Sequence, residues 1–482
     1  MADAKDCERF DPLDPEEARP RGLLPADLEQ NKIPDERLAP VESLREIPQR
    51  LAPAEDLLPE WRQKGGLDGP LSAEALDGSW YLRLVPEGGG APLHGVLRIE
   101  AKPEFGLQVS ADLYHAPSAP LRPPRKQAEC FDGLWYPHLP AAPDGWGAAY
   151  AAYLRGTAAA LVDRRDLRLA FVHYPWNAAL HDFGRGQHEG WMALRCSRRL
   201  FCHQEGIGLP TPKLHGSAML GGILHRVTAC KTSPYQRGCY VVAEEMVGTR
   251  WPANATLGGK PKTFTGVFHE HGIDIRGHFA PVKWPKINPL ACDCCFRAIN
   301  RAPFGGVPPD TWRMRLLVGL TGETPQGRRV LGVMRDDEEP YRETAVGFYK
   351  ENLPAALRVQ ANRLERKLEH GPLGGTPLAF LRTLLHEAGH VFSLQHRADL
   401  VDVPPGQTLM EPTSAVIANA LPGQQRYPQN AKFCFSDHDV AVLLHAPDVQ
   451  VAPGRMPYNW LPGFVQGGVL PWREVEAWRT RT

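Results

Sequence analysis

Apolar and polar residues alternate along several short segments in the first half of the chain, a pattern typical of strands that bury one face. Segments 79–85 and 95–100 flank a turn rich in glycine and proline at 88–92, which predicts a β-hairpin. The same alternation recurs at 106–114, 167–174 and 190–195. Short strands at this spacing predict a β-sandwich or a β-barrel.

Two further strand-like segments, 238–244 and 266–275, come next. Their pattern fits either the β-rich region or a sheet of the unit that follows, and both assignments stay open. His269 and His271 flank Glu270 in the second segment, where alternation would place both imidazoles on one strand face. Because no third partner is evident nearby, we interpret them as surface or structural residues rather than as metal ligands.

From Trp312 onward the pattern changes to apolar strands followed by helices. Strands are predicted at 314–320, 329–334 and 344–349, and a helix is predicted over 354–370. Another helix, over 436–445, has Ser436 as its predicted N-cap. Strands and helices in this order predict a mixed sheet packed against helices.

A helix is predicted to begin at Thr376 and Pro377, because a hydroxyl can cap the first amides and proline has no amide to lose at the first helical position. His386 and His390 lie one turn apart on this helix. Apolar residues recur at steps of three and four, which indicates one broad buried face; they are Phe380, Leu381, Leu384, Leu385, Ala388 and Val391.

Two imidazoles at positions i and i+4 of one helix can bind a single metal ion, and Glu387 projects from the same turn toward water on that metal. His386, Glu387 and His390 therefore predict a zinc site with a carboxylate general base. A catalytic zinc needs a third protein ligand and an open fourth position. His396 lies six residues beyond His390, where the chain must leave the helix and turn back to reach the ion.

The resulting pattern, HExxHxxxxxH, resembles that of the metzincin zinc metalloproteases. Residues 408–414 resemble the Met-turn of that clan in its matrixin form, and residues 435–443 resemble the start of the last matrixin helix. The resemblance implies one catalytic Zn²⁺ held by three histidines, with Met410 beneath the metal. It also implies a mixed sheet with an active-site helix, and hydrolysis of a protein or peptide substrate with Glu387 as general base.

The chain departs from the metzincin pattern in two places. Ser393 stands where these enzymes usually have glycine at the tight turn after the helix, and serine in a left-handed turn costs about 1 kcal/mol. The predicted helix at 354–370 occupies a place where a matrixin has strands. As in matrixins, the tyrosine that helps to stabilise the oxyanion in some metzincins is absent, since Pro412 stands at its position, and Tyr427 is a candidate substitute.

The same residues leave two alternatives to a metzincin peptidase. Glu411, twenty-one residues beyond His390, could replace His396 as the third ligand in a zinc hydrolase of another clan or substrate. A metal ion could instead staple a binding or structural protein without catalysis. A purely structural site, however, has no need of a general base at Glu387.

The chain has 482 residues, of which 43% are hydrophobic, and its 55 basic residues balance its 55 acidic ones. This balance gives no electrostatic argument for nucleic acid or an anionic membrane, and we expect neither as a partner. The N-terminus is polar and no apolar run is long enough to span a bilayer, so we expect a cytoplasmic protein unless a non-classical route exports it. No pattern indicates the oligomeric state.

Cysteines and tryptophans change this picture little. The tight cluster of Cys292, Cys294 and Cys295 lacks a second pair for a zinc knuckle, so buried free thiols are favoured over a disulfide or a second metal. Tryptophans of the β-rich region fit core or rim packing better than a carbohydrate or peptide platform; they are Trp80, Trp135, Trp146, Trp176 and Trp191.

The chain therefore divides into four predicted regions. Residues 1–74, rich in proline and charge, form an N-terminal extension. Residues 75–285 form a β-rich sandwich or barrel with a candidate role in substrate recognition, residues 286–450 form the metzincin-like catalytic domain, and residues 451–482 form a C-terminal appendage. The predicted fold class is α+β.

Overall fold

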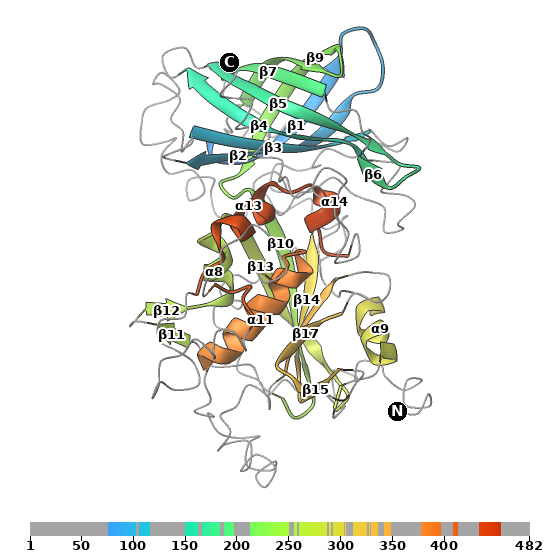
Figure 1. Ribbon diagram of the computed structural model, residues 1–482, viewed down its shortest axis with the longest axis vertical. Coiled ribbons are helices and arrows are strands. Elements are labelled where there is room, and N and C mark those ends of the chain that lie inside the picture. Colours follow the sequence, from blue (N-terminus) through green and yellow to red (C-terminus); the bar gives the residue numbers. More distant parts are fainter. Residues whose placement is uncertain are drawn as a thin grey trace, which may run out of the picture.

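The computed structural model contains a β-rich unit and a second unit in which helices pack on a sheet (Figure 1). It describes residues 76–102, 106–115, 150–161, 166–183, 188–196, 213–249, 255–257, 260–286, 289–290, 293–302, 304, 312–324, 327, 329–335, 342–348, 377–396, 408–412 and 433–454. The predicted extension 1–74, the predicted helix 354–370 and Tyr427 lie outside these residues. None of the described helices combines the length and the apolar composition that crossing a lipid bilayer requires.

Eight strands of the first unit form a closed antiparallel barrel. Strand β1 pairs with β9 and β4 pairs with β5, which closes the ring. The short strand β6 (Asp182–Phe183) pairs with the end of β5. The sequence predicted a sandwich or a barrel, and the closure decides for the barrel. Its strands are β1 (Gly78–Pro86), β2 (Leu93–Lys102), β3 (Gly106–His115), β4 (Tyr150–Leu161), β5 (Asp166–Asn177), β7 (His188–Cys196), β8 (Lys213–Leu220) and β9 (Ile223–Ser233).

The barrel interior is apolar because alternate residues of each strand point inward. Trp80 belongs to this interior cluster, in agreement with the core or rim packing predicted for the tryptophans. Trp191 is instead 43% exposed on the outside. The outer face of β2 and β3 carries the polar residues Arg98, Ser110 and Asp112, and each of them is nevertheless buried. This polar outer face is therefore covered by another part of the protein.

The second unit is built on a five-stranded sheet in the order β13-β10-β14-β18-β17. The first four strands in this row run parallel, and β17 is an antiparallel edge strand beside β18. The strands are β10 (Arg237–Met246), β13 (Ile273–Trp284), β14 (Arg313–Gly319), β17 (Gly332–Met334) and β18 (Thr344–Phe348). Two small pairs accompany them, β11 (Ala255–Leu257) with β12 (Lys260–Lys262), and β15 (Gly322–Glu323) with β16 (Arg329–Val330).

Strands β10 and β13, whose assignment the sequence left open, belong to the second sheet. The change from barrel to sheet falls between Ser233 and Arg237, upstream of the boundary at residue 285 that the sequence suggested. The predicted strand at 266–275 is wrong in its first half, because residues Phe264–His269 form helix α8. Thr263 caps this helix, with its side chain accepting a hydrogen bond from Gly266 N–H, and this capping outweighs the alternating pattern.

Helix α11 (Pro377–Val391) lies across one face of the second sheet (Figure 1). Met314, Leu316 and Val318 of β14 share a buried cluster with residues of α11 and α8. Leu317, between them in sequence, points to the opposite face, where α9 (Asp293–Arg301) packs. The apolar face predicted for the histidine helix therefore holds it against the sheet.

Helices α13 (Asp437–His445) and α14 (Asp448–Val451) stand between the sheet and the barrel (Figure 1). The predicted cap of α13 is confirmed, because Ser436 and Asp439 form a capping box. His445 at the end of α13 is buried, with Nδ1 3.0 Å from Ser110 Oγ of the barrel. These helices therefore cover the polar outer face of the barrel.

A network of buried charges fixes α14 to the barrel. Asp448 Oδ1 lies 3.4 Å from Arg98 Nη1 and 3.1 Å from Arg237 Nη1, and Asp448 Oδ2 accepts a hydrogen bond of 2.7 Å from the Tyr114 hydroxyl. The backbone N–H of Asp448 donates to Asp112 Oδ1 at 2.9 Å. Because buried charges must be paired, this network ties the two units together.

Candidate metal centre

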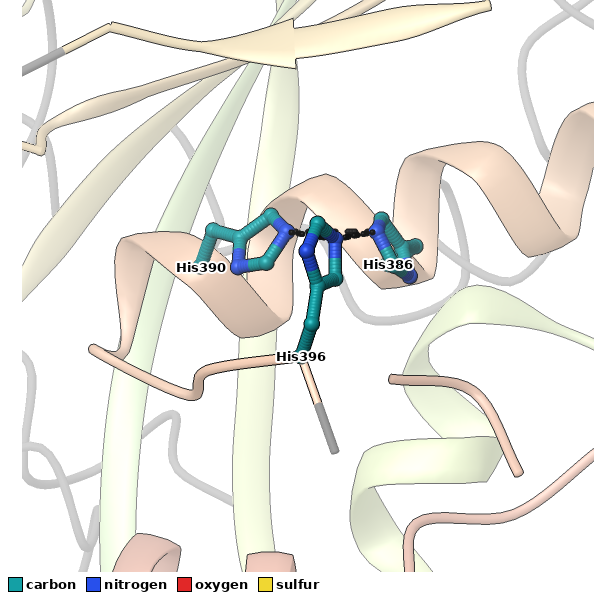
Figure 2. A group of neighbouring side chains, drawn as sticks. All are labelled: His386, His390 and His396. Carbon is teal, nitrogen blue, oxygen red and sulfur yellow. Dashed lines mark hydrogen bonds between the residues drawn. The ribbon is translucent and has the colours of Figure 1, made fainter. Parts of the chain in front are cut away.

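His386, His390 and His396 meet at the end of α11 (Figure 2). Two of the rings project from successive turns of the helix, and His396 reaches them from the segment that follows. The Nε2 atoms form a triangle, with His386 3.0 Å from His396, His390 3.1 Å from His386, and His390 3.2 Å from His396. The structure therefore brings together all three predicted ligands.

The triangle fits a tetrahedral metal ion. Zinc binds imidazole nitrogen at about 2.0–2.1 Å, so three ligands in a tetrahedral arrangement lie about 3.3 Å apart, close to the spacing of the Nε2 atoms. The group consists of histidines alone, and imidazole suits zinc, copper, iron and nickel. The three histidines therefore form a candidate metal centre.

Two backbone carbonyls orient the helical imidazoles. His386 Nδ1 donates to the Leu409 carbonyl and His390 Nδ1 donates to the Leu394 carbonyl, each at 2.7 Å. An imidazole with its proton on Nδ1 presents a lone pair on Nε2. Both bonds therefore favour the tautomer that binds a metal through the atoms that converge in Figure 2.

Burial also keeps these two imidazoles neutral. Desolvation, followed by the neighbouring His390, holds the pKa of His386 well below its usual range. Desolvation lowers the pKa of His390 to about 4, and the nearby His396 acts in the same direction. At neutral pH both rings are therefore in the form that coordinates a metal.

The chain reverses directly after α11 through a Schellman motif. Leu394 N–H donates to the Gly389 carbonyl at 2.9 Å and Ser393 N–H donates to the His390 carbonyl at 2.8 Å, the two bonds of this C-cap. Ser393 has a φ of 65°, so it occupies the left-handed position where metzincins have glycine. The turn directs the chain back toward the helix, which brings His396 to the other two rings.

Met410 packs against α11 next to the histidines. It is fully buried, and its sulfur lies in the space that a Cβ on Gly389 would need. Leu409 N–H donates to the Cys434 carbonyl at 3.0 Å, which joins this turn to the segment that leads into α13. The described part of the predicted Met-turn, residues 408–412, therefore lies beside the histidine helix.

Glu387 lies on the same helical turn and is as buried as His386 and His390. Burial raises the pKa of its carboxyl to about 8, against a backbone hydrogen bond from Met334 and the positive charge of Arg382. A Cβ on Gly332 would lie 2.7 Å from Glu387 Cγ and 2.8 Å from Oε1. Edge strand β17 therefore runs directly beside this carboxylate.

The other candidates lie apart from the centre. Glu411 is buried in the Met-turn. The group of described residues that could hold a metal contains His396 and not Glu411 as its third member. His269 Nε2 lies 3.4 Å from Asp274 Oδ1, and His271 Nε2 accepts a hydrogen bond from Phe435 N–H, so both have the structural roles expected of them. Cys295 is buried in α9 outside any disulfide, and the side chains of Cys292 and Cys294 are not among those described.

Several parts of the site escaped sequence reasoning. Arg382 contacts the Met-turn, Gly332 makes room for Glu387, and the carbonyls of Leu394 and Leu409 orient imidazoles. A charged residue within the apolar pattern of α11 was a signal for Arg382. The remaining features depend on contacts between segments, for which the sequence carries no local signal.

No protein family matches this sequence, and comparisons with curated proteins and with solved structures find no significant similarity. The resemblance to metzincins stands on the residues themselves, a three-histidine cluster in HExxHxxxxxH spacing followed by Met410. The function is therefore argued from the geometry and chemistry of this centre.

Proposed function

We propose that this protein is a zinc-dependent endopeptidase. The observation that supports it best is the convergence of three imidazole Nε2 atoms at the end of α11, the helix that also carries the buried carboxylate of Glu387. His386, His390 and His396 would hold the ion and leave a coordination position for water or substrate. Zinc at such a site supplies water of lowered pKa and polarises a substrate carbonyl.

Glu387 is the general base of this proposal. It accepts the proton of the attacking water and then delivers it to the leaving amine. Burial raises the pKa of this carboxyl to about 8 despite the hydrogen bond from Met334 and the charge of Arg382, and a divalent cation nearby would favour the ionised form that the role requires. The hydrogen bond from the Met334 backbone holds the carboxylate on the side of β17.

Strand β17 is the proposed substrate-binding edge. Among the described strands it is one of the two edge strands of the second sheet, opposite β13, and its Gly332 lies against Glu387. An extended peptide can pair with a strand edge through backbone hydrogen bonds, which align the scissile carbonyl without specifying side chains. This arrangement favours a protein or peptide as substrate.

Zinc content and peptide cleavage, measured on the same preparations, test the proposal. We expect wild-type protein to contain stoichiometric zinc and to cleave members of a broad peptide library. Glu387→Ala should keep the zinc and lose at least about 100-fold in cleavage rate, because general base catalysis contributes that much. Glu411→Ala is the matched control, since it removes another buried glutamate of the second unit.

A further variant separates the possible ligand sets. His396→Ala should lose zinc while Glu411→Ala retains it. The reverse result would assign the third ligand to Glu411 and overturn the metzincin-like arrangement. Zinc in the wild type without cleavage of any peptide would instead favour a binding protein stapled by its metal.

A further inference from the structure

Arg382 is a buried cation one helical turn before His386. Arg382 is 1% exposed, on a helix whose residues Leu381, Leu384 and Leu385 belong to the apolar core. Burying a guanidinium removes it from water at a large cost in free energy unless it is hydrogen-bonded or paired. The contacts of Arg382 therefore indicate what the charge is for.

The guanidinium gathers three carbonyl groups of the Met-turn. Arg382 Nη2 lies 3.3 Å from the Thr408 carbonyl oxygen and 3.2 Å from that of Leu409, and it also donates to the carbonyl of Glu411. Buried carbonyls without donors are costly, so this cation stabilises a turn that has no regular secondary structure. Arg382 thereby joins α11 to the turn.

The Leu409 carbonyl links this contact to the metal centre. It accepts a hydrogen bond from Arg382 and also the 2.7 Å bond from His386 Nδ1. Met410, which packs against Gly389, lies between two of the residues whose carbonyls Arg382 contacts. A displacement of the turn would therefore change both the orientation of His386 and the packing beside it.

We propose that Arg382 is a positioning residue of the metal centre, which holds the Leu409 carbonyl where it orients His386 and keeps Met410 seated against the helix. The inference rests on the proposed metal site and does not depend on peptidase activity. All three carbonyls contact one nitrogen of the guanidinium, Nη2, whose direction is fixed by the planar group, unlike the freely rotating ammonium of lysine.

Arg315 offers a matched control elsewhere in the second unit. It is as buried as Arg382 and also donates to backbone carbonyls, those of Ile299 and of Ala302 at the end of α9. Arg315→Met thus removes a comparable set of hydrogen bonds from a buried guanidinium to backbone carbonyls, on the face of the sheet opposite α11. It reports the general effect of losing a buried arginine.

The test is metal binding by full-length Arg382→Met and Arg315→Met, with Zn²⁺ affinity from competition titration and the absorption spectrum of the Co²⁺ form. We expect Arg382→Met to bind Zn²⁺ about 10- to 100-fold more weakly, the usual effect of disturbing a group that orients a ligand, and to show an altered Co²⁺ spectrum. Arg315→Met should keep the wild-type affinity and spectrum even where its thermal stability falls.

Wild-type affinity and spectrum in folded Arg382→Met would overturn the inference. If that variant does not fold, Arg382→Lys takes its place, because it retains the charge without the planar group that directs Nη2 at the turn. We expect a loss of at least several-fold in Zn²⁺ affinity, and wild-type affinity would overturn the positioning role. Failure of the wild type to bind Zn²⁺ would instead count against the proposed function, so the two failures are distinguishable.

Discussion

The sulfur of Met410 lies against Gly389, in the volume that a Cβ on this helical residue would fill. Gly389 therefore serves a packing purpose inside α11, where glycine is otherwise unfavourable. The contact places the turn that contains Met410 directly against the helix, at the residue next to His390. Any side chain at position 389 competes with Met410 for the same space.

Gly389→Ala should therefore destabilise the protein. Alanine improves helix propensity by about 1 kcal/mol, but overpacking a filled core costs about 1–3 kcal/mol, so the clash outweighs the gain. The free energy of unfolding in urea measures the net change. In a double-mutant cycle with Met410→Ala, we expect a coupling of more than about 0.5 kcal/mol, and strict additivity would refute the contact.

Ser393 tests the left-handed turn that returns the chain to His396. Its φ of 65° is accessible to glycine without strain but costs an L residue about 1–2 kcal/mol, and more where the side chain is β-branched. We expect Ser393→Gly to exceed Ser393→Val in stability by about 1–2 kcal/mol or more, measured by thermal unfolding with and without zinc. Equal stabilities would contradict the conformation.

Gly332 tests the contact between the edge strand and Glu387. Gly332→Ala places a Cβ against the carboxylate side chain, so we expect kcat/KM to fall at least about 10-fold while zinc content is unchanged, since misplacing a catalytic group by about 1 Å has large effects. Gly88→Ala adds the same methyl group at a turn with open space around it and should leave cleavage intact. Full activity of Gly332→Ala would contradict the close contact between β17 and Glu387.

Asp448 tests how the barrel is joined to the second unit. Asp448→Ala leaves the buried Arg98 and Arg237 without one of their carboxylates, so we expect a loss of about 3–5 kcal/mol in the free energy of unfolding. The exposed pair of Lys262 and Glu270 is the comparison, because Glu270→Ala should cost no more than about 1 kcal/mol. Similar losses in both variants would mean that the buried network contributes little.

Asp77 predicts a pH dependence of stability. Burial raises the pKa of its carboxyl from the ordinary 3.8 to about 6, while hydrogen bonds from Ala101 and Gly78 act in the other direction. Between about pH 4 and about pH 6 the folded protein therefore binds more protons than the unfolded chain, and stability falls as pH rises. Relative to Asp77→Asn, the wild type should lose stability across this window, as measured by urea unfolding. A rise in the relative stability of the wild type across this pH window would contradict the prediction.

The sequence alone was sufficient for the helix and for the residues of the centre. The apolar periodicity over 380–391 follows from helix geometry, and that geometry places His386, Glu387 and His390 within two turns. The left-handed turn at Ser393 was anticipated by comparison with the metzincin glycine, and the cap at Ser436 from its residue type. These features depend on residues near one another in the chain, so local patterns identify them.

Tertiary structure decided what the local patterns left open. Alternating strands fit a sandwich as well as a barrel, and only the pairing of β1 with β9 and of β4 with β5 closed the ring. The same ambiguity hid the membership of β10 and β13 in the second sheet, while the capping of α8 by Thr263 overrode an apparent strand.

The supports of the centre are likewise products of packing. His386 and the Leu409 carbonyl are 23 residues apart, and Arg98 and Asp448 are 350 residues apart. Residue type shows that each can donate or accept a hydrogen bond, but not which partner it meets, because that depends on how separate segments come together in space. The sequence by itself therefore determined the candidate ligands and the candidate base, and tertiary contacts alone determined the groups that hold them in position.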